Sequence, residues 1–94
     1  MTVIESTLKD LGYTEQIALK EFALLNASQK KAEFEQENQY FESKYKSSFS
    51  EFEHNIKSAN DEIFEHEDDY LAWKFVFDGI GYWQSRVAQL RLTA

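Results

Sequence analysis

The sequence contains no cysteine, no proline and only three glycines. Without cysteine there are no disulfide bridges and no thiolate metal sites, and the composition fits a reducing compartment. The scarcity of proline and glycine removes most of the residues that end helices and form turns. The sequence therefore predicts helix as the default conformation and all-α as the fold class.

Long apolar runs are also missing. No stretch approaches the roughly 20 apolar residues that span a bilayer, and residues 1–5 have neither the basic flank nor the apolar centre of a signal peptide. Hydrophobic residues nevertheless make up 43% of the chain and aromatic residues 16%, which is too much for a disordered segment. We therefore expect a single α-helical domain over residues 1–94, located in the cytoplasm and without membrane contact.

Basic residues are also few: the chain has 10 lysines and arginines against 17 aspartates and glutamates, which gives a formal net charge of -7. Most of the excess acid lies in residues 48–94. A negative field repels phosphate backbones and attracts basic surfaces, so it argues against direct nucleic-acid binding and favours a basic protein partner. Acidity that merely keeps the protein soluble is the alternative explanation.

The first half of the chain predicts two helices. A short helix is expected over residues 3–11, with Gly12 in the left-handed conformation that commonly ends a helix. Thr14 is placed to cap a second helix, and no helix-breaking residue follows between residues 16 and 45.

Two further helices are expected in the second half. Ser48 and Glu51 have the spacing of a capping box, so a third helix should begin there and end near residues 58–60. Asp68 or Asp69 is expected to cap the last helix, where acidic side chains complement the helix dipole. The third helix should turn three apolar side chains inward: Phe49, Phe52 and Ile56.

The long helix over residues 16–45 has a coiled-coil-like pattern. One seam position holds Ile17, Leu24, Lys31, Asn38 and Tyr45, and the other holds Lys20, Ala27, Phe34 and Phe41. Lys31 and Asn38 interrupt the seam, so the middle of the helix is either solvated or faces polar contacts from a partner. A second apolar stripe widens the N-terminal half, which we expect to be core: Ala18, Phe22, Leu25 and Ala32.

The last helix has a clear apolar seam, in which residues recur at alternating spacings of three and four: Trp73, Val76, Ile80, Trp83, Val87 and Leu90. This seam predicts that the last helix packs antiparallel to the long helix as a hairpin, with Trp83 largely buried. Gly79 and Gly81 lie inside the helix, where each costs about 1 kcal/mol relative to alanine. A close helix approach or a local kink is the expected reason.

The same helix carries aromatic residues beyond this seam, namely Tyr70, Phe77 and Tyr82. Either the two short helices cover them within one chain, or they form a protein interface, where aromatic side chains are enriched. The surplus of apolar surface on more than one face predicts a homodimer.

The sequence contains few residues in catalytic or metal-binding patterns. Glu62 and His66 stand four residues apart, with Glu65 and Asp69 nearby, a spacing that a divalent ion can use. We favour a different interpretation, in which His66 lies at a solvated helix boundary within an acidic cluster. The sequence has no phosphate-binding glycine loop and no nucleophile motif, so we expect neither an enzyme nor a bound metal or cofactor.

Residues 44–83 resemble a known class of proteins. The order Lys-Tyr-x-x-Ser-Phe-x-Glu-Phe-Glu over residues 44–53, followed by Phe-Glu-x-Glu-Asp-Asp-Tyr-x-x-Trp-Lys over residues 64–74, is similar to small acidic helical antitoxins of prokaryotic toxin–antitoxin modules. The resemblance implies an acidic and aromatic surface that neutralises a basic, often nucleic-acid-directed, toxin.

The sequence thus predicts a non-enzymatic protein-binding module that masks a basic partner. Acidic side chains would steer the partner, and aromatic side chains would be desolvated as anchors. The alternative is a structural protein whose hairpin self-associates as a dimeric helical bundle. The expected partner-binding residues are Glu65, Glu67, Asp68, Asp69, Tyr70, Trp73 and Phe77.

Overall fold

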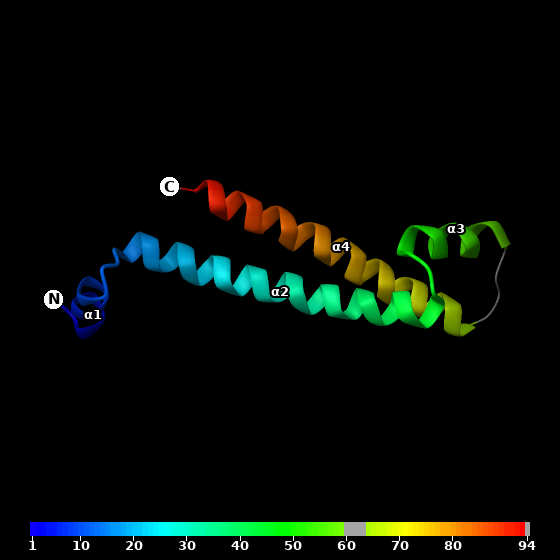
Figure 1. Ribbon diagram of the computed structural model, residues 1–94, viewed down its shortest axis with the longest axis horizontal. Coiled ribbons are helices and arrows are strands. Elements are labelled where there is room, and N and C mark those ends of the chain that lie inside the picture. Colours follow the sequence, from blue (N-terminus) through cyan, green and yellow to red (C-terminus); the bar gives the residue numbers. More distant parts are fainter. Residues whose placement is uncertain (60–63, 94) are drawn as a thin grey trace.

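The computed structural model describes residues 1–59 and 64–93 (Figure 1). This part of the chain contains four helices and no strand, which confirms the all-α fold class. They are α1 (Val3–Asp10), α2 (Glu15–Tyr45), α3 (Phe49–Ala59) and α4 (Phe64–Leu92).

The predicted hairpin is confirmed. Figure 1 shows α2 and α4 running side by side in opposite directions, with α1 at one end and α3 folded over the other. The molecule measures 64 × 22 × 17 Å, and its radius of gyration is 19.6 Å. A compact chain of this length has a radius of gyration of about 12 Å. The protein is therefore a thin rod whose helices have few neighbours.

Local sequence signals place most helix ends correctly. Gly12 has a φ of 81°, in the left-handed region that glycine adopts freely, just after the end of α1. The Thr14 hydroxyl accepts a hydrogen bond of 3.1 Å from the Ile17 amide and caps α2. The Ser48 hydroxyl accepts a hydrogen bond of 3.2 Å from the Glu51 amide at the start of α3. All three predictions are confirmed.

The start of α4 differs from the prediction. The helix begins at Phe64, so Asp68 and Asp69 lie inside it and neither is its cap. Both are still close to the positive end of the helix dipole, where acidic side chains are tolerated. Helix α3 ends at Ala59, within the expected range. Residues 60–63, which include the candidate metal ligand Glu62, lie outside the described residues.

The core lies where α3 covers the α2–α4 hairpin. Trp73 is fully buried, and its ring lies against Phe41, Phe49 and Phe52 with ring centroids 5.1 to 5.5 Å apart. Val76 is also buried in this cluster. Because Phe49 and Phe52 both face inward, α3 docks on the hairpin in the way that the apolar pattern predicts.

The opposite end of the hairpin is less well covered than expected. Ala27 is buried, but Phe22 is 67% exposed and Leu25 is 58% exposed, so the prediction that the second apolar stripe also belongs to the core is wrong. Trp83 is mostly covered, as expected, but less completely than the fully buried Trp73. The physical reason is the lack of a third layer, because α3 packs at the far end and α1 is too short to cover the α2 surface.

The polar interruption of the α2 seam is explained by the core tryptophan. The Trp73 indole N–H donates a hydrogen bond of 2.8 Å to the Asn38 side-chain oxygen. A buried indole needs such an acceptor. Asn38 therefore makes its polar contact within the chain, with α4, which is a third arrangement beside the two expected ones. Lys31 instead pairs with Glu35 on the same helix at 3.8 Å.

Gly79 marks a close approach between α2 and α4. A Cβ atom added at Gly79 would lie 3.0 Å from two ring carbons of Phe34, whereas one added at Gly81 would meet nothing within 4 Å. The expected close approach is therefore found at Gly79, where the ring of Phe34 occupies the space of the missing side chain.

Candidate functional site

The acidic segment at the start of α4 is divided between different faces of the helix. The Lys44 ammonium group donates hydrogen bonds to Glu65 at 2.8 Å and to Asp69 at 2.7 Å. The Tyr45 hydroxyl also donates to Asp69. Two of the predicted partner-binding acids are therefore engaged within the chain, where they hold the start of α4 against the end of α2.

This ion-paired cluster shifts the pKa values of its members. Hydrogen bonds to Asp69 and then to Glu65 raise the pKa of Lys44 above its usual range. Burial acts to raise the pKa of Asp69, but the hydrogen bonds from Lys44 and Tyr45 outweigh it, so the pKa of Asp69 is lowered. Burial, followed by the hydrogen bond to Asp69, raises the pKa of Tyr45 to about 12. The cluster favours charged Asp69 and neutral Tyr45.

The cluster gives the fold a pH dependence on the alkaline side. The folded protein holds the Tyr45 proton more tightly than the unfolded chain, in which the pKa is 10.0. Its contribution to stability is therefore complete below pH 10 and is lost as the pH rises towards 12. Tyr45→Phe has no such proton, so its melting temperature should fall less steeply between pH 10 and 12 than that of the wild type. The melting temperatures are measured by circular dichroism. If they fall in parallel with pH for wild type and Tyr45→Phe, Tyr45 makes no such contribution.

The predicted aromatic anchors face the core and α3. Trp73 is fully buried, which corrects the expectation that it is a surface anchor. The Tyr70 hydroxyl donates a hydrogen bond of 2.7 Å to Glu53 on α3, and this bond lowers the pKa of Glu53. The Phe77 ring stacks on Phe49 at 4.8 Å but stays 46% exposed. Helix α3 therefore covers Tyr70 and part of Phe77, whereas Tyr82 stays 52% exposed.

A different set of α4 side chains forms the exposed surface. Leu71 is 64% exposed, Phe75 is 69% exposed and Tyr82 is 52% exposed. Together with two exposed acidic residues they recur at spacings of three and four, and we call this set the α4 stripe: Asp68, Leu71, Phe75, Asp78 and Tyr82. At 3.6 residues per turn the stripe lies about 130° around the helix from the core seam. It therefore faces away from α3 and borders the contact with α2, where Phe75 meets Phe34.

Neighbouring side chains hold the aromatic rings of the stripe in place. The Phe75 ring meets the edge of Phe34 on α2 at a centroid distance of 5.6 Å. The Arg86 guanidinium group lies 5.2 Å from the centre of the Tyr82 ring and donates a hydrogen bond of 3.3 Å to its hydroxyl group. Rings that are already held in position lose less conformational entropy when a partner covers them.

Sequence reasoning missed Leu71 and Phe75, although their spacing was a usable signal. Both follow the same alternation of three and four as the core seam. Of the predicted site residues, Asp68 belongs to the α4 stripe, and Glu67 is exposed beside it.

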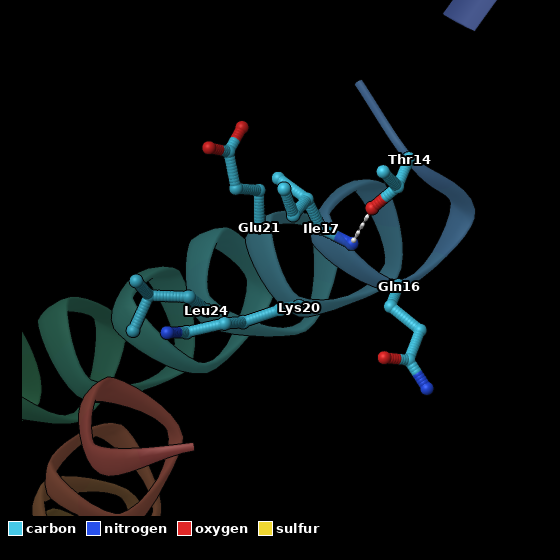
Figure 2. A pocket seen from close by; sticks show the side chains of 6 residues that line it. All are labelled: Thr14, Gln16, Ile17, Lys20, Glu21 and Leu24. Atoms are coloured by element: carbon cyan, nitrogen blue, oxygen red, sulfur yellow. Dashed lines mark hydrogen bonds between the residues drawn. The ribbon is translucent and has the colours of Figure 1, made fainter. Parts of the chain in front are cut away.

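The hollow at the other end of the hairpin offers no catalytic arrangement. Figure 2 shows it lined by Thr14, Gln16, Ile17, Lys20, Glu21 and Leu24, with the Gln16 and Glu21 side chains pointing to opposite sides. The Thr14 hydroxyl already caps α2, and the Lys20 ammonium group donates a hydrogen bond of 2.5 Å to the Thr93 carbonyl oxygen. The polar groups of this hollow do not converge on a common point.

The described residues also hold no cluster of three or more potential metal ligands. His66 lies against the rings of Tyr45 and Phe52, at centroid distances of 5.6 and 6.4 Å. Within residues 1–59 and 64–93, none of the helices has the length and apolar character needed to cross a membrane.

Comparison of the chain with protein-family models, with curated proteins and with solved structures finds no match.

Proposed function

We propose that this protein is a non-enzymatic binding module that masks a basic protein partner, in the manner of the antitoxins that its second half resembles. The α4 stripe is the recognition surface. The observation that carries the proposal is the combination of exposed acidic and large apolar side chains along one face of a well-packed helix.

The apolar part of the stripe supplies the binding energy. Phe75, Leu71 and Tyr82 are each more than half exposed, and clustered apolar side chains of this size on a protein surface mark interaction sites. Aromatic side chains that become desolvated at the centre of an interface commonly dominate its affinity. Phe75 lies in the middle of the stripe and is its expected anchor.

The acidic part selects the charge of the partner. Asp68 and Asp78 lie within the stripe, and Glu67 is exposed at its edge. Because Asp78 lies 3.9 Å from Lys74 on the same helix, the acidic character of the stripe depends mainly on Asp68 and Glu67. Because the whole chain has a formal net charge of -7, a basic protein is attracted from a distance and then meets acidic groups around the apolar contacts. Glu65 and Asp69 have a different task, since they fix the helix through Lys44.

The test uses two phenylalanines that are matched in exposure. Phe75 on the stripe is 69% exposed and Phe22 on α2 is 67% exposed. Immobilised wild type, Phe75→Asp and Phe22→Asp are incubated with an extract of the source organism, and the retained protein is purified for titration calorimetry. We expect a basic protein to bind wild type and Phe22→Asp, and to bind Phe75→Asp at least about tenfold more weakly, which corresponds to about 1.4 kcal/mol.

Equal binding by all three proteins would exclude the stripe as the recognition surface. Retention of no basic protein by the wild type would contradict the proposal as a whole.

A further inference from the structure

The outer face of α2 carries a second exposed seam. Its residues recur at spacings of four and three, and none of them is charged: Ala18, Phe22, Leu25, Gln29, Ala32 and Gln36. At 3.6 residues per turn they lie on the side of α2 opposite to the residues that pack against α4. We call this set the α2 outer seam.

From Phe22 to Gln36 the seam is open to solvent, whereas Ala18 is partly covered. Phe22 is 67% exposed and Leu25 is 58% exposed, and Tyr40, one turn beyond the seam, is 62% exposed. An alternating spacing of three and four is the pattern by which one helix packs against another. The hairpin itself offers no helix on this side, because α4 lies against the opposite face.

Helix α1 extends the uncovered surface. Ile4 and Leu8 of α1, together with Ala18, Leu19 and Phe22 of α2, line a largely apolar hollow, in which Glu15 is the one charged lining residue. Ile4 is 72% exposed, and α1 buries no residue at all. Isolated helices shorter than about 12 residues are marginal in water, and α1 has eight residues. We therefore expect α1 to be stabilised by packing against a further surface.

The charge pattern fits a second copy of this chain. Two copies with a formal net charge of -7 each repel one another. Their contact surface must therefore keep acidic groups of the two chains apart. The α2 outer seam meets this condition. The acids beside its middle are paired within the chain, because Lys30 lies 3.7 Å from Glu33 and Lys31 lies 3.8 Å from Glu35. The seam itself contains no acidic residue that could pair with a basic partner.

The surface area of the molecule is large enough for such a contact. The accessible surface is 7225 Å², whereas a compact monomer of this mass exposes about 5,700 Å². The excess of roughly 1,500 Å² per chain, summed over two chains, falls within the range of about 2,000–5,000 Å² that obligate homodimers bury.

We infer that the α2 outer seam and α1 form the interface of a symmetric homodimer, in which the two hairpins pack as a bundle through their α2 helices. Gln29 and Gln36 lie within this interface, where polar residues in an apolar seam fix the register of the two helices. This places self-association on a different helix from the surface that binds the basic partner.

Sedimentation equilibrium tests the inference with the matched phenylalanines. At tens of micromolar, wild type and Phe75→Asp are expected to be dimers. Phe22→Asp is expected to be a monomer, with a dissociation constant raised at least about a hundredfold, because the new charge is buried without a counterion. Circular dichroism checks that the long helices persist, as expected for a side chain that is 67% exposed in the single chain.

A wild-type monomer at these concentrations would overturn the inference, and so would a dimer that persists in Phe22→Asp. These outcomes leave the proposed function untouched, because that proposal depends on Phe75 and a different partner.

A distance measurement tests the same inference without disrupting the seam. The chain has no native cysteine, so Asn26→Cys beside the seam takes a single spin label. If the dimer forms through α2, the labels of the two chains should show strong dipolar coupling. This coupling should disappear when labelled chains are diluted with unlabelled ones. Ser85→Cys on α4 is the control and should give a longer distance. Coupling that is stronger at Ser85 than at Asn26 would place the interface on α4 instead and contradict the inference.

Discussion

Trp73→Ala is expected to lower the free energy of unfolding by about 3–5 kcal/mol, the range for removal of a fully buried aromatic side chain. Trp73 is completely buried, its ring packs against three phenylalanines, and its indole N–H pairs with Asn38. The substitution leaves a large cavity and an Asn38 carbonyl oxygen without its donor. Since small domains have only about 5–15 kcal/mol of stability in total, a substantial fraction of the protein should unfold.

The matched control is Trp83→Ala. Trp83 belongs to the same α4 seam but is only partly buried, so its replacement should cost clearly less than that of Trp73. Urea denaturation followed by circular dichroism gives both values. An equal or larger loss for Trp83→Ala would show that the core lies further along the hairpin than the structure places it.

Charge reversal at Glu67 and Asp68 is expected to slow association with the basic partner by about ten- to a thousandfold at low salt, the range of electrostatic steering. Both side chains are exposed, so replacing them with lysine should leave the fold intact. Dissociation should change much less, because exposed charges at the rim of an interface act mainly on the association rate. Stopped-flow measurement of the two rate constants tests this prediction directly.

The control changes the net charge by the same amount at a distance from the stripe. Asp10 and Glu51 are exposed acids on α1 and α3, and their replacement by lysine should slow association much less than reversal at the stripe. Equal slowing by both pairs would mean that the overall charge matters and that the stripe does not.

Much of the fold could be predicted because its signals are local. The caps at Thr14 and Ser48 and the turn at Gly12 depend on residues within one helical turn. The α4 seam from Trp73 to Leu90 is also a property of one segment. These signals establish four helices and a hairpin without knowledge of the packing.

The buried face of the N-terminal half of α2 could not be predicted in the same way. Two apolar stripes of similar character run along this half, one containing Leu24 and Ala27 and the other containing Phe22 and Leu25. Which stripe is covered depends on where α4 lies and on how far α3 reaches. That information belongs to the tertiary structure and not to the spacing within the helix.

The candidate site was misplaced for a related reason. The sequence prediction places consecutive acidic and aromatic residues on one surface, but each residue of a helix is rotated by about 100° from the last. Asp68 therefore faces solvent, Asp69 faces Lys44, and Tyr70 faces α3. The exposed side chains of Leu71 and Phe75 can be identified only when this rotation is applied along the helix.

The most direct test of the proposed recognition surface is nuclear magnetic resonance of the isotope-labelled protein titrated with its purified basic partner. The account predicts that the largest shift changes occur at Leu71, Phe75 and Tyr82, with little change in α3. Shift changes concentrated at Phe77 and on α3, with the α4 stripe unaffected, would contradict it.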